Sequence, residues 1–126
     1  MEFNLAPDIQ SQLNIIINRL DLPYIDPQRI VCFRSHGSTS RAQARIWSLP
    51  RIWQTALKVK AHYCIEILSE KFDHLKTDDQ IRVLIHELMH IPKNFSGALL
   101  SHRHGRYHRL DSRTVETLFQ QFKEYD

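Results

Sequence analysis

The sequence predicts a compact α+β domain in which a small twisted sheet packs on a histidine-bearing helix, with further helices near both ends of the chain. Three observations predict it. Apolar residues recur at helical spacing in three segments. Between the first and second of these segments, β-branched and aromatic residues gather in short runs typical of strands. The pattern His-Glu-x-x-His at 86–90 indicates that the second helical segment carries functional side chains.

Length and composition are those of a globular protein. The chain has 126 residues, of which 42% are hydrophobic and 25% charged, so we expect one domain over residues 1–126. The start, MEFNLAPDIQ, lacks the features of a signal peptide, and no run approaches the roughly 18 apolar residues of a membrane span. We therefore expect a cytoplasmic protein with no membrane partner. Its oligomeric state is left open.

The amino-terminal part predicts a helix followed by a strand. The helix is expected over 7–20, where apolar residues share one face and Pro7 suits the first turn. Two prolines in DLPYIDP end it. RIVCFRS at 29–35 is rich in β-formers and predicts a strand, and HGSTSRAQ predicts a loop.

Two further strands are expected between 44 and 68. The first is ARIWSL at 44–49, and the following PRIWQTAL is compatible with a short helix or an extended segment. The second is AHYCIEIL at 61–68, whose alternate residues face opposite sides. Cys32 and Cys64 lie in strand-like runs, and we expect buried reduced thiols rather than a disulfide or metal ligands. The two expected faces of 61–68 carry Tyr63, Ile65 and Ile67 on one side and His62, Cys64 and Glu66 on the other.

The motif lies on a helix predicted over 77–91. Thr77 and Gln80 have the spacing of a capping box, and Pro92 is expected to stop the helix. A closing amphipathic helix is expected to start near Asp111. Its apolar residues are Val115, Leu118, Phe119 and Phe122.

The facing of the motif helix predicts a metal site. At 100° per residue with His86 as origin, the apolar residues fall between roughly 140° and 260°, His90 at about 40° and Glu87 at about 100°. Burial of the apolar stripe against the sheet would therefore turn both imidazoles toward a cleft. Side chains at i and i+4 are close enough for two imidazoles to bind one Zn²⁺ at about 2.0 to 2.1 Å. Glu87 would then act as general base toward the zinc-activated water.

A hydrolytic zinc site needs a third protein ligand and one open position. The candidates in SHRHGRYH are His102, His104 and His108. A metzincin pattern would require glycine at 93 and histidine at 96, but the chain has Lys93 and Ser96. A thermolysin-like site would use a glutamate on the next helix, for which Glu116 is suitably distant.

The motif and its surroundings resemble known families. HELMHIPKNFSGALLSHRHG, preceded by RIVCFRSHGSTSRAQARIW and YCIEILSEKFDHL, resembles the phage metallopeptidase family of archaea, bacteria and their viruses over residues 28 to 110. HELMH followed by a loop and HG also resembles SprT-like proteases. These resemblances imply a zincin-like fold, a zinc metallopeptidase acting on proteins or peptides, and His104 as third ligand beside His86 and His90. The aromatic residue that SprT-like proteases carry a few positions later is His108 in this chain, which leaves His102 and His108 as alternatives.

The resemblance also bears on the substrate. It implies that a peptide pairs with a sheet edge, and strand 61–68 is the candidate for that edge. Tyr107 or His108 is a candidate donor to the developing oxyanion, with simple packing or exposure as the alternative. Three residues in the basic region are expected to lie on the solvated surface, and the alternative is that they contact substrate. These three residues are Arg34, His36 and Arg45.

An uneven charge distribution supports a second function class. The net charge is +3, yet no acidic residue occurs from Pro27 to Ile65, where seven are basic. Such a stretch indicates either a polyanionic partner or a solvated basic face. The alternative function is therefore a catalytically silent, zinc-stabilised module that binds nucleic acid or a protein partner through its basic surface.

Overall fold

Four strands form one mixed sheet with the order β1-β2-β4-β3. The computed structural model describes residues 1–101 and 111–125. β1 is antiparallel to β2, β2 is parallel to β4, and β3 is antiparallel to β4. The strands are β1 (Glu2–Leu5), β2 (Ile30–His36), β3 (Ala44–Ser48) and β4 (Tyr63–Leu68).

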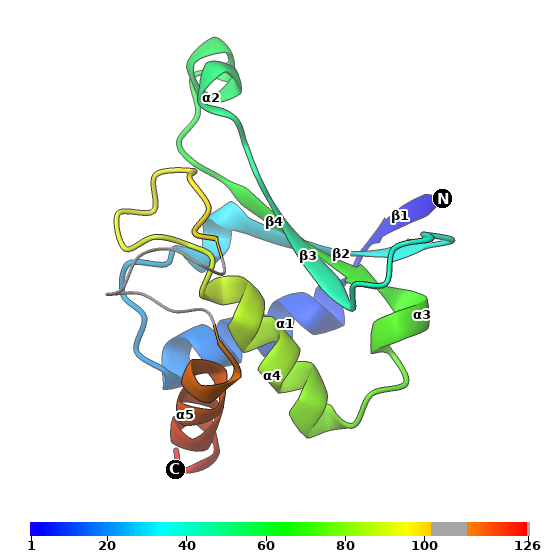
Figure 1. Cartoon of the computed structure of the whole chain (residues 1–126). Helices are drawn as coiled ribbons and strands as arrows, with labels where there is room; N and C mark the ends of the chain where they lie inside the picture. The colour runs from blue at the N-terminus through cyan, green and yellow to red at the C-terminus, as the bar shows by residue number, and fades with distance from the viewer. Residues whose placement is uncertain (102–110, 126) are drawn as a thin grey trace.

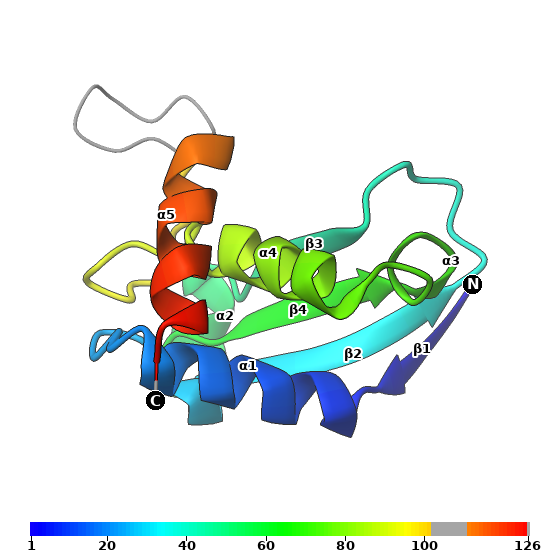
Figure 2. The ribbon, with the colours of Figure 1, turned by 90° about the horizontal axis from the view of Figure 1, so that it is seen from below.

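The long helices lie together on one side of this sheet. Figure 1 shows α1, α4 and α5 below the strands, while α2 projects at the opposite end of the molecule. Figure 2, seen from below, shows α1 and α4 running alongside β2 and β4. The helical segments are α1 (Pro7–Arg19), the 3₁₀ turn η1 (Pro27–Arg29), α2 (Arg51–Leu57), α3 (Ser69–Phe72), α4 (Thr77–Leu88) and α5 (Ser112–Lys123).

Strand register decides which side chains meet the helices. Cys32 and Ile46 both pair with Ile65, and these positions share the face that packs on the helices. Ile65 is fully buried there. On the opposite face, Val31 is 38% and Trp47 is 51% exposed, so only one side of the sheet contributes to the main core.

The predicted α+β class is confirmed. Strands and helices were placed correctly to within a few residues for α1, β2, β3, β4 and α5, and PRIWQTAL forms the helix α2 rather than an extended segment. The expected alternation in β4 is also confirmed for Tyr63, Ile65 and Ile67. β1 was not predicted, because its residues are exposed and it is ordered by pairing with β2.

Three details of the prediction were wrong. The capping box is absent, since Lys76 is the N-cap of α4 and the Gln80 side chain donates instead to the Phe72 carbonyl. The short helix α3 in SEKF was not predicted. Strand 61–68 was the expected sheet edge, but β4 lies between β2 and β3, which leaves β3 at the edge.

The cysteines are free thiols, as expected. Cys32 is buried and Cys64 is half-buried. Burial raises the pKa of Cys32 to about 12, so this thiol remains protonated and unreactive at neutral pH. A separate observation concerns the helices: none in the described part of the chain is long and apolar enough to cross a membrane.

Candidate active site

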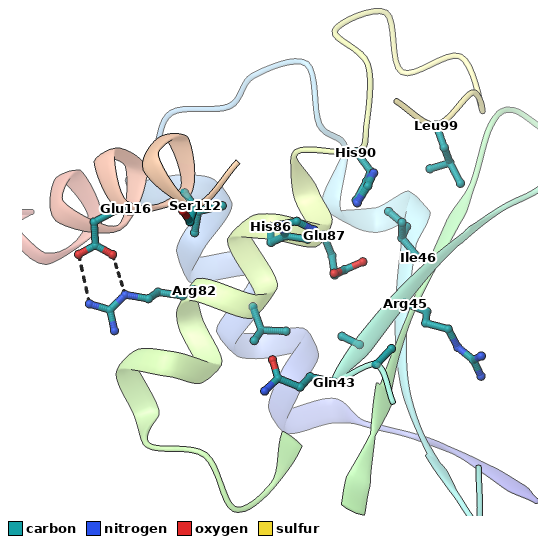
Figure 3. Close-up of a pocket in the computed structure, with 14 residues that line it drawn as sticks. Gln43, Arg45, Ile46, Arg82, His86, Glu87, His90, Leu99, Ser112 and Glu116 are labelled. Carbon is teal, nitrogen blue, oxygen red and sulfur yellow. Dashed lines mark hydrogen bonds and ion pairs between the residues drawn. The ribbon is translucent and has the colours of Figure 1, made fainter. Parts of the chain in front are cut away.

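Helix α4 buries its apolar stripe and presents the motif on another face. Ile81, Leu84, Ile85 and Leu88 are at most 5% exposed and belong to the core cluster. His86 is half-buried and lines a cleft together with Glu87 and His90. Figure 3 shows His86 and Glu87 on the last turns of α4 and His90 just after the helix, all bordering the cleft. The expected facing of this helix therefore agrees with the structure.

The carboxyl end of α4 differs from the prediction. The helix ends at Leu88 rather than at residue 91. His90 and Ile91 donate backbone hydrogen bonds three residues back, to Glu87 and Leu88, so the last turn is of the tighter 3₁₀ type. Pro92 disfavours helical geometry at the preceding residue, which explains why regular helix stops early. His90 is thus presented from a tightened turn.

His86 and His90 nevertheless lie beside one another. Their ring centroids are 5.2 Å apart with an interplanar angle of 76°. Two rings at this separation can each direct one nitrogen to a shared cation at the zinc–nitrogen distance of about 2.0 to 2.1 Å. Neutral imidazoles are common zinc ligands, so the donor chemistry of this pair fits the expected metal.

The orientation of His90 is set by Leu100. His90 Nδ1 lies 2.5 Å from the Leu100 carbonyl oxygen, and the Leu100 N–H donates to the His90 carbonyl at 2.7 Å. A carbonyl can only accept, so the bond requires the proton on Nδ1 and assigns the ring's lone pair to Nε2. Metal-binding histidines commonly make such a bond, because it holds the tautomer and the ring orientation.

The segment that precedes Leu100 is hydrogen-bonded to Tyr63 of β4. Tyr63 Oη accepts from the Gly97 N–H at 2.9 Å and donates to the Ala98 carbonyl at 2.8 Å. The Tyr63 ring also packs edge-to-face on Phe95 at 5.0 Å between centroids. Gly97 has φ +95, a conformation that favours glycine, and so permits the chain to reverse. The chain therefore returns to His90 along a defined path.

Glu87 is a buried carboxyl at the wall of the cleft. Its residue exposure is 7%. Burial raises the pKa of Glu87 to about 8, because the charged form loses its hydration. Figure 3 shows its carboxyl directed toward β3, between α4 and the sheet edge. A buried carboxyl of this kind is suited to exchange protons with a molecule in the cleft.

The cleft lies between α4, α5 and the edge strand β3, and it has a volume of about 820 Å³. Its apolar wall includes Ile46, Val83, Leu99 and Val115. At one end Glu116 forms a two-bond ion pair with Arg82, at 2.8 and 3.2 Å. This engagement makes Glu116 a poor third ligand, so the thermolysin-like alternative has little support.

A buried charge network holds β3 to the sheet. The fully buried carboxylate of Glu66 accepts hydrogen bonds from Ser35 Oγ at 2.6 Å, Arg45 Nη2 at 3.0 Å and Trp47 Nε1 at 2.9 Å. Burial acts to raise the pKa of Glu66, but the hydrogen bonds outweigh it and the pKa lies below its ordinary value. Two of these donors come from β3, so the network fixes the strand that borders the cleft.

The basic stretch is divided by the fold into two groups. Arg34 pairs with Asp8 and Asp73, and Arg45 pairs with Glu66, so both have structural partners. His36 lies 3.7 Å from Glu70 on the exposed surface. Within the stretch from Pro27 to Ile65, the Arg and Lys side chains without an ion pair to the described residues are Arg41, Arg51, Lys58 and Lys60.

The histidine candidates for a third ligand lie outside the described residues. His102, His104 and His108, together with Tyr107, belong to the segment 102–110. Within residues 1–101 and 111–125, no group of three or more His, Cys, Asp or Glu side chains is arranged to hold a metal. The assignment of His86, His90 and His104 as metal ligands therefore stays a prediction.

Comparison with known protein families matches residues 1–123 to the family described as "Putative phage metallopeptidase". The chain belongs to this family. The match extends beyond the resemblance at residues 28 to 110, and the family name indicates a metal-dependent peptidase acting on proteins or peptides. No curated protein and no solved structure matches this phage metallopeptidase family member. The SprT-like resemblance stays a prediction.

Two site residues of this metallopeptidase family member were not identified from the sequence. Leu100 acts through its backbone carbonyl, which every residue possesses, so no sequence signal marks it. Tyr63 was placed on the correct strand and face, but its bonds to Gly97 and Ala98 span 34 and 35 residues. Only the packing of the returning segment against β4 brings these groups together.

Proposed function

We propose that this protein is a zinc-dependent metallopeptidase in which His86 and His90 bind the metal and Glu87 is the general base. The third ligand in this proposal is His104, with His102 and His108 as alternatives. The supporting observation is the convergence of the two imidazoles and a buried carboxyl on one cleft beside a free strand edge. When bound, zinc polarises a peptide carbonyl and lowers the pKa of a water molecule to about 7.

The chain's own groups have distinct tasks in this proposal. In its ionised form, which a neighbouring cation favours over the protonated form, Glu87 accepts the proton of the attacking water at a carboxylate oxygen and returns it to the leaving amine nitrogen, which balances the hydrolysis. Leu100 holds the His90 ring through the Nδ1–H bond. The edge of β3 offers backbone donors and acceptors that can pair with an extended peptide. Apolar walls of the cleft exclude water around the scissile bond.

Replacement of Glu87 by glutamine tests this mechanism. Glu87→Gln is expected to retain zinc and to lower hydrolysis of a denatured protein substrate by about 10² to 10⁴, the usual contribution of a general base. Glu124→Gln, on the exposed residue after α5, is the matched control and should leave hydrolysis unchanged. Zinc content by atomic absorption and peptide release are measured for both variants. Full activity in Glu87→Gln would reject the mechanism.

The alternative is a catalytically silent zinc module that binds nucleic acid or a partner protein. It is supported by the four Arg and Lys side chains of the stretch from Pro27 to Ile65 that form no ion pair with the described residues. Two measurements separate it from the peptidase. A silent module has four protein ligands to zinc and no open position. Binding to DNA through phosphates would also weaken steeply as the salt concentration rises.

A further inference from the structure

Helix α2 turns an apolar face toward solvent. At 100° per residue, Ile52, Trp53, Ala56 and Leu57 fall within about 140° of the helix surface, and we call them the α2 apolar face. All four are exposed; Ile52 is 76%, Trp53 54% and Leu57 57% exposed. Surface helices of soluble proteins ordinarily bury such a face against the core. In α2 no residue is buried.

The projection is nevertheless well folded. The Gln54 side chain donates to the Leu49 carbonyl at 2.9 Å, and the Val59 N–H donates to the Gln54 carbonyl at 3.0 Å. Lys58 closes the helix in a left-handed conformation, with φ 56. Gln54 is the one half-buried residue of α2, so the polar side of the helix faces inward. The outward position of the apolar face is therefore built into the fold.

Cations surround this face. Arg51 precedes it and Lys58 and Lys60 follow it; we call them the α2 cations. All three are exposed, and no ion pair engages them among the described residues. The whole stretch from Pro27 to Ile65 has no acidic residue that could balance them locally. A complementary partner is therefore both apolar and negatively charged.

We propose that the α2 projection, residues 49–62, docks this protein on an anionic lipid surface, with the α2 apolar face in the interfacial region and the α2 cations on lipid headgroups. Tryptophan and aliphatic side chains favour this zone, and basic residues near it gain from the negative surface potential. The surface of a seven-residue helix is small compared with the roughly 800 Å² that each partner buries in a stable protein interface. A bilayer, in contrast, requires no surface of complementary shape.

Other partners fit the chemistry less well. Two copies meeting through α2 would bring six cations together without an acidic residue between them. Nucleic acid would engage the cations and stack on Trp53, but it offers little to aliphatic side chains such as Ile52 and Leu57. A helix that spans a membrane needs a long apolar run, whereas a helix that docks on its surface needs only one apolar face. The absence of a long apolar run therefore does not bear on α2.

Co-sedimentation of the full chain with vesicles tests the proposal. Binding is expected to vesicles of phosphatidylcholine mixed with phosphatidylglycerol and to be much weaker with phosphatidylcholine alone. Ile52→Asn should lower binding at least about tenfold, because one interfacial aliphatic side chain is lost. Ile15→Asn is the matched control, since Ile15 is 45% exposed on α1, and it should bind like wild type.

A second pair of variants tests the charges. Arg51→Gln combined with Lys60→Gln should lower binding roughly twenty-five-fold, at about a factor of five for each cation near the surface. Lys71→Gln combined with Lys76→Gln removes the same net charge from exposed positions outside the projection and should have little effect. Equal losses in both double variants would show that only the net charge matters and would overturn the proposal.

Tryptophan fluorescence locates the contact. The chain has two tryptophans, so Trp47→Phe leaves Trp53 as the only reporter. Its emission should shift to the blue and resist quenching by acrylamide when anionic vesicles are added. An unchanged spectrum on bound protein would overturn the proposal. A different pattern would also overturn it: wild type does not bind vesicles, whereas Ile52→Asn loses duplex DNA binding or self-association. None of these measurements depends on peptidase activity.

Discussion

His90 and Leu100 bond to each other twice, through the His90 ring and through the main chain. The ring nitrogen Nδ1 donates to the Leu100 carbonyl, and the Leu100 N–H donates to the His90 carbonyl. The end of α4 is thereby joined to the start of the histidine-rich segment.

Removal of the Tyr63 hydroxyl should weaken zinc binding without unfolding the protein. Tyr63→Phe keeps the ring contact with Phe95 but loses the bonds to Gly97 and Ala98, which position the segment that orients His90. Loss of such supporting contacts commonly lowers metal affinity by about tenfold or more. Competition with a chromophoric chelator measures the effect. Tyr24→Phe, on a half-buried tyrosine outside this segment, is the control. Equal affinities in all three proteins would contradict the anchoring role.

Single alanine variants of the downstream histidines should identify the third ligand. His104→Ala is expected to lower zinc affinity by at least about a hundredfold, because one of three protein ligands is lost. His102→Ala and His108→Ala should retain stoichiometric zinc. Zinc content after dialysis against a weak chelator separates the three variants. If His102→Ala or His108→Ala alone loses the metal, the ligand is reassigned to that residue.

Acid should weaken the link between β3 and β4 through Glu66. Its pKa lies below the ordinary value of 4.5 in the folded protein, so the unfolded chain takes up the proton first as the pH falls. The stability that Glu66 contributes is present above pH 4.5 and is lost as the pH falls through its folded-state pKa. Glu66→Gln should unfold more easily at pH 7, by about 1 to 3 kcal/mol. It should also show a flatter acid dependence than wild type or Glu124→Gln in urea titrations.

Pairing of substrate with β3 should depend on alternate peptide amides. In an antiparallel pair, only every second residue of the peptide donates its N–H to the strand edge. N-methylation at those positions should raise KM by up to about tenfold for each lost hydrogen bond, whereas methylation of the intervening positions should have little effect. A peptide series methylated one position at a time gives the pattern. Uniform effects along the peptide would exclude pairing at the edge of β3.

Local sequence signals account for most of the secondary structure. Helical spacing placed α1 and α5, and β-formers placed β2, β3 and β4, because the period and composition of each segment can be read within that segment alone. β1 was not predicted because all four of its residues are exposed, so its sequence has no buried face to indicate a strand. The apolar stripe of α4 also predicted the side on which His86 and Glu87 lie, since burial of that stripe leaves only one direction for the motif.

Residue patterns alone predicted the α+β class, the helix that carries the motif and the pair of histidines that face the cleft, because helical periodicity and burial act within one segment. Tertiary structure decided what depends on contacts between distant segments. It made β3 rather than β4 the edge strand, brought Leu100 to His90, and paired Glu66 with Arg45 across 21 residues. Strand order and backbone carbonyl partners follow from packing of the whole chain, and a residue pattern contains no direct signal for either.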